Sequence, residues 1–375
     1  MNTEKTAAGI CLYVRPLRQK SSAEPEAGHV YHDLQAAFDD VQNGRITALT
    51  GDVHGGPVPV HIFLDEGIYS GQFYFDGCPC EGRRVPVALY LHGAGQERTV
   101  ITGGRFAREP YPAQGGLRGT FRTYTLFVSG PFAELSDLTV ENTAGNDPPA
   151  GVGVRAGQAV ALYDDAEYTH CRNVALLGHQ DTLFIAPLPL KERIPGGFAG
   201  PRDGMRRVPS VHLYEQCVIA GTTDFIFGSG AAFFDRCTIQ ARAQEGCEGY
   251  YVAAPSADVP AALTPQGVPQ AVSECGFVFY RCTVDGDAAQ VYLARPWRPY
   301  ARCACIACRF GKAVAAEHWS DWNGEGAVLT SVFTEYHNQP AASSGCGYGR
   351  ELTDGEANAL LALWEPYRAC TSVQC

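Results

Sequence analysis

The sequence lacks any apolar run close to the roughly 20 residues that a membrane-spanning helix needs, and this excludes a transmembrane protein of that kind. Charged residues are also scarce, at 18% against 45% hydrophobic residues, a balance that excludes an intrinsically disordered chain. Positive charge is the minority sign: the net charge is −11 and the pI about 5.4, which disfavours binding to nucleic acid or anionic membranes. We therefore expect no nucleic-acid partner and no membrane association.

The N-terminal segment also lacks a charged stretch followed by a sustained apolar one, so it does not resemble a secretory signal peptide. Fifteen cysteines are compatible with a disulfide framework, but the number is odd and a chain of 375 residues does not need such staples. We interpret them as reduced thiols and predict a cytoplasmic protein. A chain whose leader had been removed would instead be secreted.

What the sequence does contain is a short repeat centred on cysteine. Its copies are YTHCRNV, YEQCVIA, FDRCTIQ, FYRCTVD and, more loosely, CIACRFG. In the first four copies an aromatic residue precedes the cysteine by three positions, and the aligned positions are Leu138, Cys171, Cys217, Cys237, Cys282 and Cys308. A period of roughly 20 residues, sometimes doubled, is typical of a solenoid. Because the apolar runs are short, β-branched and bounded by glycine, we predict an all-β fold, a parallel β-helix whose coils stack like side chains.

Metal binding is the alternative interpretation of these thiols, suggested by RCACIACRF and GCPCEG. Structural zinc sites usually pair two close-spaced couples of cysteine or histidine. Cys303 and Cys305 would share one face of a strand, and the repeat explains Cys308 without a metal. We therefore expect no metal site.

Two helical segments flank the repeat. In residues 31–42, Asp33 is a candidate N-cap ahead of an apolar face formed by Leu34, Ala37, Phe38 and Val41. In residues 353–366, Thr353 and Glu356 form a capping box before an apolar run that we expect to stop at Pro366.

Such helices would cover the open ends of a solenoid, because those ends are otherwise hydrophobic. We predict one domain over residues 1–375, with residues 1–28 as an N-terminal extension.

Two long insertions interrupt the coils. The first, IAPLPLKERIPGGFAGPRDGMRRVPS, carries more basic than acidic residues, and the second runs from AQEGCEGYY to SECG. Insertions in repeat folds leave on one face and often wall a binding groove. The first insertion could therefore attract an acidic ligand, although a solvated loop with ordinary surface charge is an equally valid interpretation.

Four further segments carry polar residues in a fixed order: GQAVALYDDAEYTHC, GHQDTLF, TTDFIFGSG and YLARPWRPY. Together they resemble the pectin methylesterase family, carbohydrate esterase family 8. Weaker likenesses in DEGIYSGQF, LTVENTAG, GYYVAAPS and HWSDW extend the match over most of the chain. The resemblance implies a right-handed parallel β-helix, in agreement with the repeat.

The resemblance also implies a role for each polar residue. Asp224 matches the nucleophile that attacks the C6 methyl ester of galacturonate, and Arg295 matches the arginine that orients it. Asp181 matches the general acid and base, a role that needs a carboxyl group kept protonated by burial. Gln158 and Gln180 match the glutamines that stabilise the oxyanion.

The same resemblance assigns substrate binding to aromatic residues, on which apolar sugar faces stack. These residues are Phe184, Phe227, Trp297 and Tyr300. It implies no metal and no organic cofactor, because side chains serve both proton transfers and the oxyanion. A solenoid with covered ends can be a monomer, and we expect one.

The chain departs from the family pattern at three positions. Ala294 stands where the family usually has glycine, His179 where tyrosine or arginine is commoner, and Gly71 where a glutamate often occurs. None of the three removes a reacting group. They leave open which substrate length and methylation pattern fit the groove.

The implied function is a carboxylic ester hydrolase that removes C6 methyl esters from homogalacturonan or methylated oligogalacturonides and releases methanol. One alternative is an esterase or thioesterase of the same fold acting on another acyl substrate. Others are a glycosidase or lyase on the same solenoid, and a non-catalytic pectin-binding β-helix. Individually, the aspartates could close turns, Arg295 could be a structural ion-pair partner and Trp297 could belong to the core.

Overall fold

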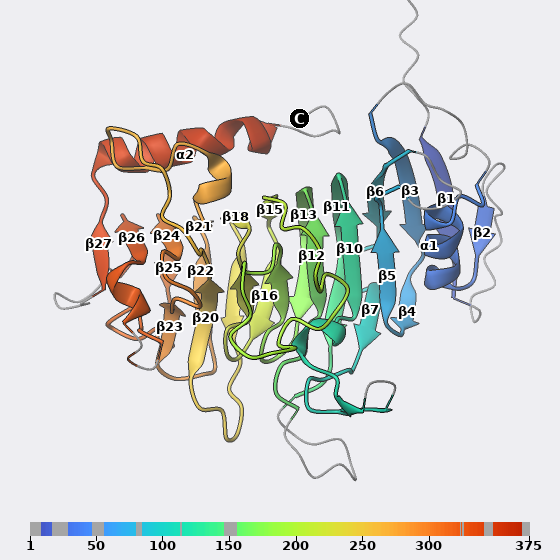
Figure 1. Cartoon of the computed structure of the whole chain (residues 1–375), viewed down its shortest axis with the longest axis horizontal. Helices are drawn as coiled ribbons and strands as arrows, with labels where there is room; N and C mark the ends of the chain where they lie inside the picture. Colours follow the sequence, from blue (N-terminus) through green and yellow to red (C-terminus); the bar gives the residue numbers. More distant parts are fainter. Residues whose placement is uncertain are drawn as a thin grey trace, which may run out of the picture.

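The computed structural model describes residues 9–16, 29–46, 56–79, 85–112, 115–145, 156–322, 324, 326–340 and 348–369. The described strands form the coils of an elongated parallel β-helix, which runs from β1 to β27 along the long axis of the molecule in Figure 1. The predicted all-β fold is confirmed.

The larger sheet wraps around two sides of the helix. Its strands are β1 (Ile10–Val14), β2 (His29–Tyr31), β3 (Val58–Leu64), β4 (Gly67–Ser70), β6 (Val87–His92), β7 (Thr99–Gly103), β11 (Phe132–Asn142), β13 (Tyr168–Leu177), β15 (Val211–Glu215), β16 (Val218–Gly221), β18 (Ala231–Asp235), β19 (Thr238–Ala241), β21 (Phe277–Tyr280), β22 (Thr283–Gly286), β24 (Arg302–Ile306), β25 (Arg309–Phe310), β26 (Val332–Tyr336) and β27 (Gly349–Glu351). The long strands β11 and β13 cross the corner between the two sides, and each pairs with strands on both.

The smaller sheet forms the third side and carries the residues of interest. Its strands, in spatial order, are β5 (Phe73–Asp76), β10 (Leu126–Gly130), β12 (Leu162–Ala166), β14 (Leu183–Ile185), β17 (Ile226–Gly228), β20 (Tyr250–Pro255) and β23 (Val291–Ala294). All its pairings are parallel, so equivalent residues of successive coils lie side by side. A short antiparallel pair, β8 (Pro110–Tyr111) and β9 (Gly116–Leu117), lies apart from both sheets.

The corner of the larger sheet explains the cysteine repeat. One residue per coil adopts left-handed backbone angles there, with φ between 52° and 56°, at Asp137, Asn173, Gln216, Arg236, Arg281, Ala307 and His337. The residue that follows turns into the core, where Cys217, Cys237, Cys282 and Cys308 are at most 1% exposed. Each of these thiols donates a hydrogen bond to a carbonyl of the preceding coil, as Cys237 Sγ does to Tyr214 O at 3.3 Å. Cysteine therefore recurs because it is small, apolar and able to satisfy the carbonyl beside each bend.

The first copy of the repeat was aligned wrongly. Cys171 pairs with Tyr214, and Val174 is the residue that stacks with Cys217 and Leu138. The bend in β13 comes two residues after Cys171, at Asn173, so the cysteine lies before the corner rather than after it. The spacing between the aromatic residue and the cysteine could not reveal this, because Cys171 would be buried whether it preceded or followed the bend.

Helix α1 (Leu34–Gln42) covers the N-terminal end of the coils (Figure 1). Asp33 is its N-cap, with Oδ1 accepting from the Ala36 amide at 2.7 Å, and the four predicted apolar residues form its buried face. The helix begins later than predicted, because Tyr31 belongs to β2. Of the predicted extension 1–28, residues 10–14 form β1, which pairs with β2 and β3, and most of the remainder lies outside the described residues.

Helix α2 (Asp354–Ala369) has the predicted capping box, with the Thr353 amide donating to Glu356 Oε2 at 2.8 Å. It does not stop at Pro366 but runs one turn further. Its position also differs from the expected end cap, because it lies along the side of the coils (Figure 1). Trp364 packs there against Phe233, since the outer face of β15, β18, β21 and β24 is apolar and needs a cover.

Candidate active site

Two buried aspartates occupy equivalent positions of successive coils. Asp181 lies two residues before Leu183 of β14, and Asp224 lies two residues before Ile226 of β17. Leu183 and Ile226 are paired in the sheet, and the Asp181 amide donates to Thr223 O at 3.1 Å. The backbones of the two aspartates are therefore one strand spacing apart, about 4.8 Å.

Both aspartates have left-handed backbone angles, with φ of 64° at Asp181 and 48° at Asp224. Non-glycine residues adopt this conformation at an energetic cost, and such residues concentrate at functional sites. Both side chains are also buried, at 8% and 6% exposure. Strain and burial at two stacked acids are unfavourable for folding alone, so the pair is the leading candidate for a catalytic site.

Arg295 follows β23 and clamps one of the two acids. Its Nε donates to Asp224 Oδ1 at 2.9 Å and its Nη2 donates to Asp224 Oδ2 at 2.7 Å, which fixes the plane of the carboxylate. The guanidinium is itself held between two aromatic rings: its Cζ lies 3.8 Å from the ring centroid of Tyr251 and 4.0 Å from that of Trp322. Asp224 therefore has a single orientation.

The electrostatic environment separates the two acids. Burial raises the pKa of Asp181 well above its ordinary value, and the neighbouring charge of Asp224 raises it further, against a smaller lowering by Arg295. Burial also raises the pKa of Asp224, but the hydrogen bonds and charge of Arg295 oppose that rise. Asp224 consequently ionises first, and Asp181 is the acid that keeps its proton to higher pH.

The two acids lie in a cleft of about 320 Å³. Its lining consists of Thr120, Phe121, Gln158, Gln180, Asp181, Arg193, Ile194, Gly197, Phe198, Asp224, Phe227, Ala254, Arg295, Trp297, Arg298 and Trp322. Gln158 and Gln180 are partly exposed, and a backbone bond from the Ala159 amide to Gln180 O at 3.0 Å ties their coils together. Neither side-chain amide bonds to another described residue, so both are available to a ligand.

An aromatic ladder runs along the smaller sheet and reaches the cleft at Phe227. Tyr74, Phe127, Tyr163, Phe184 and Phe227 occupy successive strands of the smaller sheet in register. Phe184 is fully buried, with its ring centroid 5.0 Å from that of Phe227. It offers no face to a sugar, so its predicted role in stacking does not hold in this structure, and it supports Phe227 instead.

Of the other predicted aromatic residues, Phe227 and Trp297 line the cleft, with their ring centroids 5.8 Å apart. Tyr300 lies outside it and lines a separate cavity. Sequence reasoning missed Tyr251 and Trp322, although both belong to motifs of the family resemblance, GYYVAAPS and HWSDW. It also missed Phe121, which no motif marks.

Comparison with known proteins agrees with this geometry. The family model described as Pectinesterase matches residues 60–188 and 197–348, more than half of the chain. The chain belongs to the pectinesterase family. Between the two matched ranges, residues 189–196 are unmatched; they lie in the first insertion and contribute Arg193 and Ile194 to the cleft of this pectinesterase-family chain.

Curated relatives and solved structures with the same description are similar to this chain. It is 30% identical over 297 residues to the "Probable pectinesterase/pectinesterase inhibitor 64" of Arabidopsis thaliana, covering 74% of this chain and 40% of the relative. The chain thus spans less than half the length of that relative. Pectin methylesterase from carrot superposes with a TM-score of 0.68 at 20% identity, over 98% of this chain and 99% of that one.

A pectin methylesterase solved in complex with a hexasaccharide superposes with a TM-score of 0.63 at 19% identity, over 95% of this chain and 98% of that one. These likenesses show the right-handed parallel β-helix fold that the family resemblance implied.

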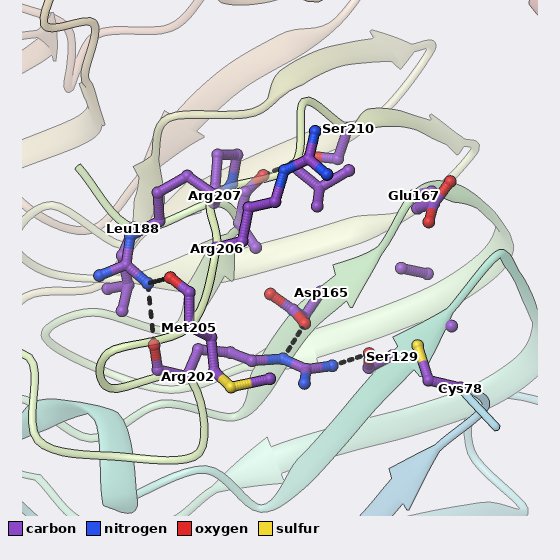
Figure 2. Close-up of a pocket in the computed structure, with 15 residues that line it drawn as sticks. Cys78, Ser129, Asp165, Glu167, Leu188, Arg202, Met205, Arg206, Arg207 and Ser210 are labelled. Carbon is purple, nitrogen blue, oxygen red and sulfur yellow. Dashed lines mark hydrogen bonds and ion pairs between the residues drawn. The ribbon is translucent and has the colours of Figure 1, made fainter. Parts of the chain in front are cut away.

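In this pectinesterase-family chain, the first insertion is anchored beside the cleft by its own arginines. Figure 2 shows the Arg202 guanidinium between Asp165 and Ser129, to both of which it donates hydrogen bonds. Burial raises the pKa of Asp165 to about 6, against the lowering effect of Arg202. Arg207 donates to the carbonyls of Arg202 and Met205. Much of the positive charge that suggested an acidic ligand is therefore used inside the protein.

In the same region a buried serine, a buried histidine and a buried aspartate are linked in a row by hydrogen bonds. His212 Nδ1 lies 2.9 Å from Asp164 Oδ2, and His212 Nε2 lies 2.8 Å from Ser210 Oγ. The Ser210 hydroxyl, however, donates to Ala186 O, so the imidazole must donate to the serine rather than accept from it. That direction is opposite to a serine nucleophile with its base. The network instead fastens the start of the first insertion to its end.

Two further findings concern other classes of site. Among the described residues, no three histidine, cysteine, aspartate or glutamate side chains are grouped so that they could hold a metal ion. In the same part of the chain, no helix has the length and apolar character required to cross a bilayer.

Proposed function

We propose that this chain hydrolyses C6 methyl esters of galacturonate in pectin and releases methanol. The supporting observation is the stacked acid pair, in which Arg295 clamps Asp224 and opposes the rise of its pKa, whereas burial and the charge of Asp224 raise the pKa of Asp181 further. Ester cleavage requires a nucleophile and a proton donor side by side, and the acid with the lower pKa suits the first role and the acid with the higher pKa the second.

In the first step, a carboxylate oxygen of Asp224 attacks the ester carbonyl carbon. The negative charge that develops on the carbonyl oxygen would accept hydrogen bonds from the side-chain amides of Gln158 and Gln180, both of which line the cleft. As the intermediate collapses, the C–O bond to the methoxyl group breaks and Asp181 gives its proton to the leaving oxygen. Methanol departs, and the sugar remains joined to Asp224 as an anhydride.

In the second step, water replaces the enzyme. Asp181, now ionised, takes a proton from a water molecule, whose oxygen attacks the sugar carbonyl carbon of the anhydride. The bond to Asp224 breaks, which frees the galacturonate carboxyl group, restores the Asp224 carboxylate and leaves Asp181 protonated. Arg295 is paired with Asp224 in the resting state and would hold its oxygens in place through both steps.

The substrate is proposed to lie in the cleft, where the partly exposed Trp297 offers apolar surface to a sugar face and the buried Phe227 contributes only a 4% exposed edge beside it. The solved complex with a hexasaccharide belongs to a similar protein, so an oligomer of galacturonate is the substrate class we infer. A monomer acting in the cytoplasm on methylated oligogalacturonides remains our prediction for the state and location of this chain. Secretion, with intact pectin as substrate, is the alternative.

The test is methanol release from methyl-esterified galacturonan. Asp224→Asn keeps the size of the side chain and removes the nucleophile, so it should abolish turnover. Asp137→Asn is a matched control, because Asp137 also has a left-handed backbone, with φ of 56°, but is exposed at a bend of β11. Full activity in Asp224→Asn would exclude the assigned nucleophile. Turnover of acyl thioesters alone, or new reducing ends without methanol, would favour the alternative enzymes.

A further inference from the structure

The turn that carries Asp224 is bonded to the coils on both sides of it. On one side, the Asp181 amide donates to Thr223 O at 3.1 Å. On the other side, the Tyr251 amide donates to Thr222 O, also at 3.1 Å. These bonds fix the turn between its neighbours, but they join main-chain atoms and do not depend on which side chain stands at position 223.

The side chain of Thr223 adds a bond that does depend on its identity. Its Oγ1 donates to Gly249 O at 2.6 Å and lies 3.3 Å from Cys247 Sγ. Because the hydroxyl gives its proton to the carbonyl, the thiol donates either to the hydroxyl oxygen or to Gly249 O, which it also approaches at 3.3 Å. The hydroxyl therefore ties Gly249, on the coil after Asp224, to the residue that directly precedes this acid.

Gly249 in turn lies against the side chain of Tyr251. A Cβ atom at position 249 would lie 2.7 Å from Tyr251 Cε2 and 3.0 Å from its hydroxyl oxygen, so the glycine backbone and the ring are in direct contact. The same ring lies under the Arg295 guanidinium, whose Cζ is 3.8 Å from the ring centroid and whose nitrogens bond to both oxygens of Asp224. The contacts form a closed cycle, which returns to Thr223 through the peptide bond before Asp224.

The bond from the hydroxyl restrains the Tyr251 ring from one direction. The ring stacks on Tyr292, its partner in β23, with the centroids 5.7 Å apart. Thr223, Gly249 and Tyr251 also line a polar cavity of about 340 Å³. If the hydroxyl were removed, a water molecule in that cavity could bond to Gly249 O, so the protein would still fold. The carbonyl would then no longer be tied to the turn.

The ionisation of Asp224 is a sensitive measure of the arginine fork. Arg295 opposes the effect of burial on the pKa of Asp224. The other charged groups nearby are Asp181 on the preceding coil and Arg108 and Glu248 in the lining of the polar cavity. If the fork moved away, it would oppose burial less, and the pKa of Asp224 would rise further above its ordinary value.

We propose that Thr223 is a positioning residue for the ester hydrolysis proposed above. Its hydroxyl holds Gly249 and Tyr251 in the place that keeps the Arg295 fork on Asp224. Thr223 acts through these residues and is assigned no contact with the substrate. The role of Asp224 as a nucleophile rests on the proposed function, whereas the tie rests on the contacts alone.

The main test is Thr223→Val, which removes the hydroxyl and keeps the shape of the side chain. It should lower kcat for methanol release by about two- to tenfold, the effect of one neutral hydrogen bond, with KM within about twofold of wild type. The acidic limb of kcat/KM should move up by about 0.3 to 1 pH unit, since Asp224 must be ionised to attack. Thr223→Ser keeps the hydroxyl and should restore both values. An unmoved acidic limb in Thr223→Val, or no recovery in Thr223→Ser, would overturn the proposal.

Thr139→Val is the matched control. Thr139 is 5% exposed, and its Oγ1 donates to Gln96 O at 2.7 Å, a bond of the same kind between distant segments. Thr139 lines neither the cleft nor the polar cavity. The control should lose a similar amount of thermal stability and keep the wild-type kcat and pH profile. An equal shift of the acidic limb in Thr139→Val would show that general loosening of the coils is the cause and would refute the role of Thr223.

Gly249→Ala tests the cycle from its other end and covers the case in which Thr223→Val does not fold. The added methyl group must displace the Tyr251 ring, although the Thr223 hydroxyl and its acceptor remain. The acidic limb should therefore move in the same direction as in Thr223→Val. If it stayed in place in the folded variant, the position of the ring would not govern the fork, and the proposal would fail.

A measurement without turnover separates this inference from the proposed function. The Arg295 Nε–H group donates to Asp224 Oδ1 in the resting protein, and NMR gives the rate at which its proton exchanges with water. We expect exchange about two- to tenfold faster in Thr223→Val and unchanged in Thr139→Val. If the wild type released no methanol but the exchange rates differed in this way, the proposed function would fail and the tie would stand. Methanol release with equal exchange rates would leave the proposed function intact and remove the role of Thr223.

Discussion

Replacing Arg295 by lysine tests the central interaction of the site without removing its charge. Arg295 donates two parallel hydrogen bonds to Asp224, at 2.9 and 2.7 Å, and its side chain is only 12% exposed. An ammonium group is a point charge that can make one such bond in this position and cannot hold the carboxylate plane. The change also removes the flat group held between Tyr251 and Trp322.

The expected loss can be worked out from these contacts. One hydrogen bond to a charged group contributes about 1.5–3 kcal/mol, and weaker stacking of a cation on aromatic rings adds about 0.5–1 kcal/mol. The total is about 2–4 kcal/mol. If it is expressed in the transition state, kcat/KM for ester hydrolysis falls by roughly 30- to 1000-fold, since each 1.36 kcal/mol is a factor of ten.

The assay is methanol release at several substrate concentrations, so that kcat and KM are obtained separately. Because the arginine orients the nucleophile and does not hold the sugar in this proposal, the loss should appear mainly in kcat. Trp322→Phe retains an aromatic ring beside the guanidinium and should lower kcat by less than Trp322→Leu. An Arg295→Lys variant within twofold of the wild-type kcat would refute the claim that the fork positions Asp224.

Three further predictions follow from single side chains. Asp181→Asn should inactivate the protein but raise its thermal stability relative to wild type, by a margin that grows with pH. The pKa of Asp181 is raised in the folded state, so the wild-type protein loses stability as the pH rises above the pKa of about 3.9 that the carboxyl group has in the unfolded chain; a margin independent of pH would contradict this. Phe184→Ala should lower the free energy of unfolding by about 3–5 kcal/mol in denaturant titrations, because the ring is fully buried; a loss below about 1 kcal/mol would place Phe184 outside the packed ladder. Arg202→Ala should speed tryptic cleavage in the first insertion under native conditions, since its bonds to Asp165 and Ser129 disappear; unchanged cleavage would show that other contacts anchor the loop.

The sequence was sufficient for the β-solenoid and for the pair of acids, because both rest on local signals. Short β-branched runs with glycine boundaries predict strands and turns wherever they occur, and the motifs around Asp181 and Asp224 identify the acids without knowledge of the fold. Helix α1 was predictable for the same reason. Its cap at Asp33 and its apolar face are encoded within about ten residues.

What the sequence could not supply depends on contacts between distant coils. Phe184 was assigned to the groove because its motif is shared with the family, yet its burial depends on Phe121, whose centroid is 5.0 Å away and whose position no motif marks. The place of α2 was likewise hidden, because the apolar face that it covers is assembled from β15, β18, β21 and β24, none of which signals an exposed outer side by itself. The repeat places Cys171 wrongly because the amino-acid composition of β13 does not indicate where the strand bends.

The separation of the two acids along the chain shows why pairing, rather than spacing, decides function in this fold. The coil that joins Asp181 to Asp224 contains the whole first insertion, whereas the next coil along the smaller sheet, from Asp224 to Tyr251, has no insertion of that length. A parallel sheet transmits register regardless of what lies between its strands, so the insertion can grow or change without moving one acid relative to the other. Under the proposed function, the sheet would fix the positions of the reacting acids and the insertions would set the substrate preference. This division predicts that exchanging residues 189–196 for those of another family member will change which esters are cleaved, measured as relative kcat/KM on substrates of different methylation. Asp224 and Arg295 should remain equally indispensable in the exchanged protein. A folded exchange variant that cleaved no ester at all would show that the insertion also belongs to the catalytic machinery.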